Sequence, residues 1–275
     1  MEKSFVPVRI LDKKWALKFV GGEMFMRSLA DFGIWKRFEN LKNEQLNNNF
    51  RNDLGEGAFR TIVMPEDDEY FKQLNKALGG HLISGKLIDY GDIQYFNLLC
   101  MYCLHYFPLT GKYENPSQRL KEFGDTAIVI TNLDAFFNRL FEKIERNNKY
   151  ASLVNTVEYY RDDRTKNLNP MFNKHASFSW QNELRIAVGR LDKAHKLKNG
   201  KYPLMKDTSP LKFEIGNLSD ITRLVPIEDF IKGNWDKTGL KHSSESLFLE
   251  QAFLKTNEIM SAYTPNEYNP MFIFG

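Results

Sequence analysis

The sequence contains little cysteine and no long apolar run. Cys100 and Cys103 are the only cysteines, too few for a disulfide scaffold, and a zinc site would need two more ligands nearby. The longest apolar stretch, Tyr95 to Leu109, is interrupted by polar residues and by proline, whereas a membrane helix needs about 20 apolar residues. No uninterrupted apolar segment of the signal-peptide type stands near the N-terminus. We therefore expect a protein of the reducing cytosol with no membrane partner.

Several familiar catalytic motifs are also missing. The sequence has no P-loop, no G-x-G-x-x-G, no G-x-S-x-G and no H-E-x-x-H, which argues against the common nucleotide-binding, serine hydrolase and zinc protease layouts. The histidines show no metal-ligand spacing; they are His81, His105, His175, His195 and His242. We therefore expect no metal site.

What the chain does contain is a large apolar fraction. Hydrophobic residues make up 42% and aromatic residues 14% of 275 residues, which is enough to bury a core and argues against extensive disorder. No linker is long enough to mark a boundary, so we expect a single domain over residues 1–275.

Periodicity predicts more strands than helices. We expect strands at 5–11, 15–20, 23–27, 86–90, 93–106, 126–130, 152–160, 183–188, 213–215 and 221–225. We expect helices at 28–41, 69–78, 136–144 and 244–260, the third capped by the segment 131–134, and a loop at 47–57. Because the helices are scattered among the strands, the pattern predicts an α+β fold with a mixed or antiparallel sheet and flanking helices.

Cys100 and Cys103 lie within the strand expected at 93–106. Their odd offset places them on opposite faces of a strand. A redox C-x-x-C normally opens a helix, so we expect both cysteines to be buried, reduced and free of metal.

Positive charge is concentrated in one segment. The whole chain carries +3, but residues 161–201 hold ten Lys/Arg against four Asp/Glu, a local charge of +6. Such a segment can face the phosphates of a nucleic acid, or it can be a solvated surface. The sequence leaves both interpretations open.

Gln181 and Glu183 stand two residues apart at the start of an expected strand, so both point to one face, which we expect to be the polar one. A carboxylate there can bind a ribose 2′-hydroxyl and stabilise an oxocarbenium cation, while the amide orients a nucleophile. Alternatively, Glu183 pairs with Arg185 or with a cross-strand lysine.

Arg27 ends an early expected strand, just before the pattern changes to helical. A guanidinium in this position can hold a pyrophosphate through a bidentate fork. The alternative is a surface ion pair.

Taken together, Arg27, Gln181 and Glu183 resemble the ADP-ribosyltransferase pattern, with an arginine on the first core strand and a glutamate two residues after Gln or Glu. For the middle-strand position of that family both Tyr102 and Thr156 are possible, and Tyr102 is preferred. Segments 25–29, 51–57 and 177–185 also resemble a widespread bacterial and phage-related family.

The resemblance implies an ADP-ribosyltransferase-like fold with a split sheet that holds NAD as co-substrate. It implies that Arg27, Ser28 and Tyr102 contact NAD, that Glu183 and Gln181 are catalytic, and that the other site residues, Phe178 and Trp180, meet the substrate. It also implies a toxin or phage-defence effector that modifies RNA, DNA or protein, with RNA or DNA favoured, and an antitoxin protein as a possible partner. The competing function is a non-catalytic nucleic-acid-binding module that uses segment 161–201.

Overall fold

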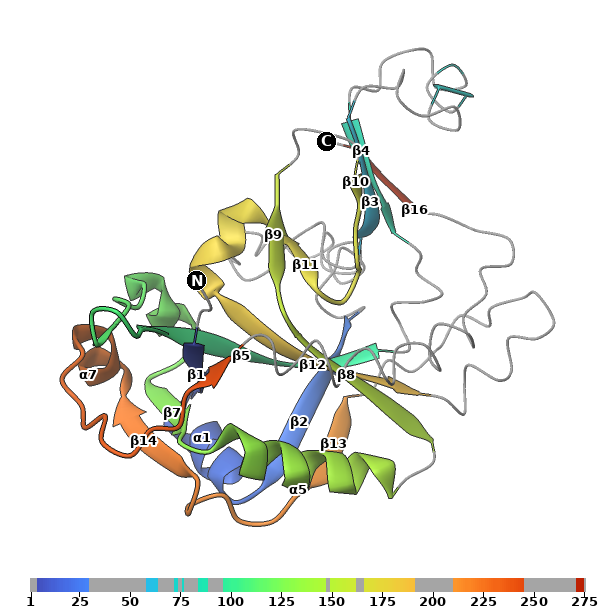
Figure 1. The fold of residues 1–275 in the computed structure, drawn as a ribbon. Coiled ribbons are helices and arrows are strands. Elements are labelled where there is room, and N and C mark those ends of the chain that lie inside the picture. Colours follow the sequence, from blue (N-terminus) through green and yellow to red (C-terminus); the bar gives the residue numbers. More distant parts are fainter. Residues whose placement is uncertain are drawn as a thin grey trace.

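A ten-stranded antiparallel sheet organises the computed structural model (Figure 1). The structure describes residues 4–29, 58–63, 84–88, 96–146, 149–161, 166–190, 210–244 and 271–274, with residues 72, 73 and 76. The main path of the sheet runs β13-β2-β5-β1-β7-β14, and β12 joins β5 on one side and β8 on the other. The expected α+β class with a mainly antiparallel sheet is confirmed.

The elements of this sheet come from distant parts of the chain. Its strands are β1 (Ser4–Leu11), β2 (Glu23–Ser28), β5 (Phe96–Phe107), β6 (Lys112–Tyr113), β7 (Thr126–Ile130), β8 (Tyr150–Thr156), β12 (Glu183–Arg190), β13 (Leu211–Glu214), β14 (Thr222–Pro226) and β15 (Ser243–Ser244). A second sheet holds β3 (Ala58–Val63), β4 (Ser84–Ile88), β10 (Lys166–Asn167) and β16 (Met271–Phe274), and a third pairs β9 (Glu158–Tyr160) with β11 (Asn173–His175).

Each face of the main sheet is covered. Helices α1 (Lys13–Val20) and α5 (Leu133–Glu145) lie on one face (Figure 1), where Phe19, Phe136 and Leu140 pack into the largest apolar cluster. The strands β9 and β11 and the 3-10 helix η4 (Ala176–Gln181) lie on the other side. The remaining elements are the 3-10 helix η3 (Gln118–Phe123) and α7 (Ile227–Lys232). As a result, β5 and β12 are covered on both faces.

One prediction for the N-terminal region is wrong: residues 15–20, expected as a strand, belong to α1. Ala16 and Phe19 are three residues apart and both are buried, while Trp15 and Leu17 remain 51% and 54% exposed. A helix places 16 and 19 on one stripe, whereas a strand would place them on opposite faces. Packing of this stripe on the sheet therefore overrides the apparent strand pattern.

Other predictions are confirmed. The strand β7 matches residues 126–130, and α5 begins after Asn132, whose Oδ1 accepts a hydrogen bond from the backbone N of Ala135 at 3.2 Å. Cys103 is buried in the cluster with α1 and α5, as expected, whereas Cys100 on the opposite face is only half-buried; neither forms a disulfide. Three predictions lie outside the described residues: the helix at 28–41 from residue 30 onward, the loop at 47–57, and the helix at 244–260 from residue 245 onward.

None of the helices in the described part of the chain is both long and apolar enough to cross a membrane.

The edge of β5 opposite β12 is shared by two strands. β1 pairs with β5 from Ser4↔Tyr106 to Val8↔Tyr102, then continues along β7. β2 pairs with β5 at Arg27↔Leu98 and Ser28↔Asn97. The sheet is therefore split on this edge between Leu98 and Tyr102, and this split lies beside the candidate site.

Candidate functional site

Glu183 opens β12 next to the centre of the main sheet. Its cross-strand partner on β5 is Tyr102, and its backbone N donates to the hydroxyl oxygen of Tyr159 at 3.0 Å. Glu183 is 8% exposed and every residue of β12 except Arg190 is buried. Gln181, Glu183 and Arg185 make this face polar, as expected, but β9, β11 and η4 cover it, so all three side chains are buried.

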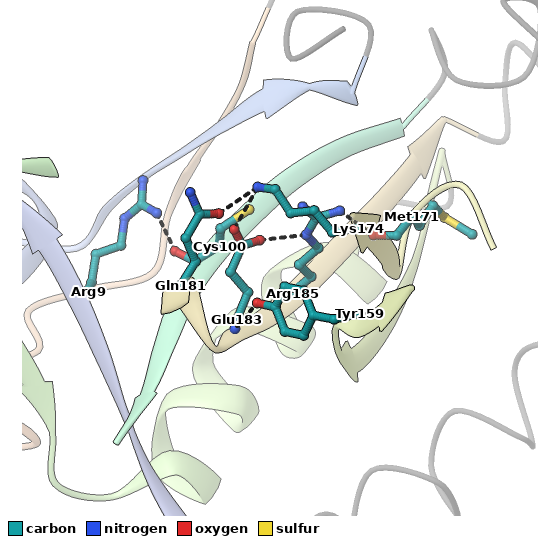
Figure 2. Close-up of polar contacts among 8 residues, drawn as sticks. All are labelled: Arg9, Cys100, Tyr159, Met171, Lys174, Gln181, Glu183 and Arg185. Atoms are coloured by element: carbon teal, nitrogen blue, oxygen red, sulfur yellow. Dashed lines mark hydrogen bonds and ion pairs between the residues drawn. The ribbon is translucent and has the colours of Figure 1, made fainter. Parts of the chain in front are cut away.

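Two cations hold the Glu183 carboxylate (Figure 2). The Lys174 ammonium donates to Oε1 at 2.9 Å, and Nε of Arg185 donates to Oε2 at 2.8 Å. Both cations are themselves buried, with Lys174 4% and Arg185 0% exposed. Arg185 also donates from Nη1 to the carbonyl of Met171 at 2.8 Å. The expected alternative, a pairing of Glu183 with Arg185, is thus present, and Lys174 adds a second partner from β11.

This arrangement keeps Glu183 ionised. Burial alone would raise the pKa of the carboxyl, but the charges and hydrogen bonds of Arg185 and Lys174 outweigh it and lower the pKa below its ordinary value. Each carboxylate oxygen accepts one hydrogen bond here and has a second lone pair. The site therefore offers a fixed negative charge with acceptor capacity.

Gln181 places an unused donor beside that carboxylate. Its Oε1 accepts from Lys174 at 2.6 Å, which fixes the orientation of the amide because an ammonium only donates. Its Nε2 is buried and has no hydrogen-bond partner among the described residues. An amide donor and a carboxylate acceptor side by side match the two hydrogen-bonding functions of one hydroxyl group. Leaving such a donor unpaired costs about 1–3 kcal/mol, which a bound hydroxyl would offset.

The turn between these two residues is formed by Asn182 in the left-handed conformation, with φ 42°. Its side chain accepts from Nε2 of His105 at 3.0 Å and donates to the carbonyl of Cys103 at 3.0 Å and to Glu114 at 3.1 Å. Because β6 follows β5 in a hairpin, Glu114 comes back beside the start of β12. These contacts fix the junction from which Gln181 and Glu183 both project.

Tyr102, not Thr156, lies beside Glu183. Paired residues of antiparallel strands share a face, and Tyr102 pairs directly with Glu183. Thr156 pairs with Leu184, which packs on the α1 and α5 side, so Thr156 belongs to the opposite face. The Tyr102 hydroxyl donates to Glu114, and burial and the Glu114 charge raise its pKa. The Tyr102 hydroxyl is thus a neutral group next to the Glu183 carboxylate.

The aromatic residues before Gln181, Phe178 and Trp180, lie in η4. The Lys174 ammonium lies 5.1 Å from the ring centroid of Phe178. Trp180 packs against η3, with the Arg119 guanidinium 4.1 Å from its ring and Phe123 at 5.6 Å. Phe178 therefore adjoins the site, whereas Trp180 anchors η4 to the neighbouring element.

Arg27 is exposed and lies on the same sheet face as Glu183. It pairs with Leu98, Leu98 pairs with Ala187, and Ala187 is four residues from Glu183 on β12. Cross-strand pairs and even offsets along a strand both preserve the face. Ser28, the next residue, points to the other face and is 1% exposed.

The sequence reasoning missed Lys174 and Arg9. Lys174 appeared there only as one charge of the basic segment, because its approach to Glu183 depends on the pairing of β9 and β11. The Arg9 guanidinium donates from Nη1 to the carbonyl of Cys100 (Figure 2). Neither residue forms a motif with Gln181 or Glu183 in the sequence, so no spacing signal could identify it.

The basic segment is not a uniform surface. Of its ten cations, Lys174 and Arg185 are buried against Glu183, and Arg161 is exposed. Residues 191–201, which hold four more, lie outside the described residues. Within the described residues, no group of three or more potential metal ligands occurs.

Comparison with known proteins gave no match to a protein-family model, a curated protein or a solved structure. The functional argument therefore depends on the geometry of this site.

Proposed function

We propose that this chain is an NAD-dependent ADP-ribosyltransferase whose reaction centre is Glu183 with Gln181. The observation that carries the proposal is the ionised Glu183 carboxylate next to the unpaired Gln181 Nε2 donor. Together they fit a ribose hydroxyl, which donates to the carboxylate and accepts from the amide. Arg27 on the same face supplies positive charge for the phosphates of the dinucleotide.

In this reaction Glu183 accepts a hydrogen bond from the 2′-hydroxyl of the nicotinamide ribose. Its negative charge stabilises the positive charge that develops on the ribose as the C1′–N bond breaks and neutral nicotinamide leaves with the electron pair. A nucleophile of the acceptor then forms a bond to C1′ and gives up its proton to solvent water. Lys174 and Arg185 hold the carboxylate in place and keep it ionised throughout.

The proposed acceptor is RNA or DNA in the cytosol, on the strength of the +6 charge of residues 161–201. Lys174 and Arg185 do not contribute to that surface because they are buried. A role as a cytosolic toxin or phage-defence effector with an antitoxin partner follows only from the family resemblance.

Release of nicotinamide from NAD tests the proposal. We expect wild-type protein to release it, and Glu183→Gln to lose at least about a hundredfold in rate, because loss of an electrostatic contact to the transition state costs about 3–4 kcal/mol. Glu228→Gln is the matched control, since Glu228 pairs with Lys121 at the surface. Rates are normalised to the folded fraction measured by circular dichroism.

Two results would contradict the proposal: no nicotinamide release by wild-type protein with any nucleic-acid acceptor, or an unchanged rate in Glu183→Gln. A purely nucleic-acid-binding module would instead bind RNA or DNA without consuming NAD, and its affinity would not fall on removal of a negative charge.

A further inference from the structure

Helix α1 carries an exposed basic and aromatic face on the side of the sheet away from Glu183. Its inner side is buried: Phe19 stacks on Phe136 of α5, with the two ring centroids 6.0 Å apart. Successive residues of a helix are rotated by about 100°, so the other side of α1 points outward. The residues there are all exposed; they are Lys13, Lys14, Trp15, Leu17 and Lys18.

Two lysines occupy the middle of this outer face. Lys14 and Lys18 are four residues apart, which makes them neighbours along the helix. Trp15 lies on one flank of the pair and Leu17 on the other. The ammonium groups of Lys14 and Lys18 each lie 5.3 Å from the centroid of the Trp15 ring, which is 51% exposed. The indole is therefore an exposed aromatic plane next to two cations.

The positive charge of this face is not balanced within the helix. The eight residues of α1 include three lysines and no acidic residue. Among the described residues, Lys13 and Lys14 form no ion pair, and Lys18 pairs with Glu23 at 3.4 Å. The side chains of Lys18 and Glu23 are 44% and 50% exposed, and such surface pairs contribute little to stability. The Lys18 ammonium can therefore exchange Glu23 for another anion.

We propose that this face of α1 binds single-stranded nucleic acid, with a base stacked on Trp15 and the neighbouring phosphates bound by Lys14 and Lys18. An aromatic plane stacks any base, and cations beside it bind the backbone, which is the usual basis of single-strand binding. The inference does not require the proposed transferase. Within that function, α1 anchors the acceptor strand outside the reaction centre.

The order of side chains across this face favours a nucleic acid over a membrane surface. A helix that lies on a bilayer buries an apolar face in it and keeps its lysines on the opposite face or at the margins. In α1 the order is reversed, because Lys14 and Lys18 form the middle of the exposed face and Trp15 and Leu17 its flanks. Phosphates of a strand can contact the lysines while a base covers the indole.

Fluorescence anisotropy of a labelled single strand of about 12 nucleotides, within the usual site size, measures binding to the full chain. We expect wild-type protein to bind the strand. Trp15→Leu should bind about tenfold more weakly, because leucine offers no stacking plane. Trp15→Phe keeps an aromatic ring and should bind within about threefold of wild type.

The chain offers a matched control in a second lysine–tryptophan pair. The Lys237 ammonium lies 4.7 Å from the ring centroid of Trp235. It donates to the backbone carbonyls of Gly233 and Trp235, and the Trp235 ring packs against an apolar cluster. Lys237→Gln should therefore bind the strand as wild type does.

The salt dependence of binding tests the lysines separately from the indole. Each phosphate contact to a single strand contributes about 0.7 to the slope of log K against log salt concentration. The double variant Lys14→Gln, Lys18→Gln should therefore lower the slope by about 1.4, whereas Trp15→Leu should leave it unchanged. Because the substituted side chains are exposed, each variant should keep the circular dichroism spectrum of wild type.

Three results overturn this surface: no binding by wild-type protein, unchanged affinity in Trp15→Leu, or an unchanged salt slope in the double lysine variant. Binding of wild-type protein to vesicles of phosphatidylcholine and phosphatidylserine, but not to the strand, also overturns it.

The failure of this inference and the failure of the proposed function give different results. Binding of the strand that depends on Trp15, without nicotinamide release, supports the α1 surface and contradicts the transferase. Nicotinamide release together with unchanged strand affinity in Trp15→Leu contradicts the α1 surface and leaves the transferase in place.

Discussion

Glu183 stabilises the fold in addition to its proposed role in the reaction, because its carboxylate neutralises two buried cations. Glu183→Gln leaves Lys174 and Arg185 without this carboxylate. Removal of one partner of a buried ion pair costs about 3–5 kcal/mol, so we expect the free energy of unfolding to fall by that amount. Urea unfolding monitored by tryptophan fluorescence measures it, with Glu228→Gln as the exposed control. A loss as small as that of the control would mean that the ion-pair network does not stabilise the fold.

The same residue predicts a pH dependence. Burial favours the neutral carboxyl, but Arg185 and Lys174 outweigh it and lower the pKa of Glu183 to about 2 from its ordinary 4.5, so the native state binds this proton less readily than the unfolded chain. The stabilisation is therefore complete above pH 4.5 and is lost as the pH falls toward 2. Unfolding free energies of wild type and Glu183→Gln, measured from pH 7 to pH 3, should differ by less and less as the pH falls from 4.5 to 3. A constant difference over that range would contradict the lowered pKa.

At the scale of elements, the junction between η4 and β12 orients the site through Asn182. Asn182→Gly keeps the left-handed backbone but loses the contacts to His105, Cys103 and Glu114. Asn182→Ala loses the same contacts and adds the strain of a side chain at positive φ, about 1–2 kcal/mol. We therefore expect Asn182→Ala to be less stable than Asn182→Gly, as measured by urea unfolding. Equal stability would show that the backbone there relaxes.

Helix α5 offers a second test at this scale. Asn132 caps it by accepting from the backbone N of Ala135, and replacing such a cap by alanine costs about 1 kcal/mol. We expect Asn132→Ala to lower Tm by roughly 2–4 °C, the shift typical of this energy in a domain of this size class. Asn132→Ser, which can cap equally well, should restore Tm; a deficit in Asn132→Ser equal to that of Asn132→Ala would count against the cap.

Single helices and strands with a clear local pattern were the part of the fold that the sequence predicted best. Strand β7 and helix α5 carry their own signals, an apolar run and a capped apolar stripe, so the prediction located both. For α1 the same reasoning failed, because its eight residues suit a strand equally well and only burial of Ala16 and Phe19 against the sheet decides between them.

At the scale of the whole molecule, a glycine contact joins segments that are almost two hundred residues apart. Gly22 has φ +103°, and a Cβ there would lie 2.2 Å from the carbonyl oxygen of Gly216. Gly216 also has positive φ, +83°, but a Cβ would meet nothing within 4 Å. We expect Gly216→Ala to cost about 1–2 kcal/mol of strain and Gly22→Ala a further 1–3 kcal/mol or so for the clash. Thermal unfolding of both variants measures the difference, and equal losses would show that β2 and β13 move apart freely.

The sequence by itself determined the fold class, the strand that carries Glu183, the Gln181-x-Glu183 spacing and the opposite faces of Cys100 and Cys103. These depend on local periodicity, which a linear pattern records. Only the tertiary structure decided that Glu183 is buried, that Lys174 shares it with Arg185, and that β1 and β2 share one edge of β5. The physical reason is that burial and ion pairing depend on which strands and helices cover a face. The pairing of β9 with β11, and of β1 and β2 with separate stretches of β5, brings together residues with no relation in sequence spacing.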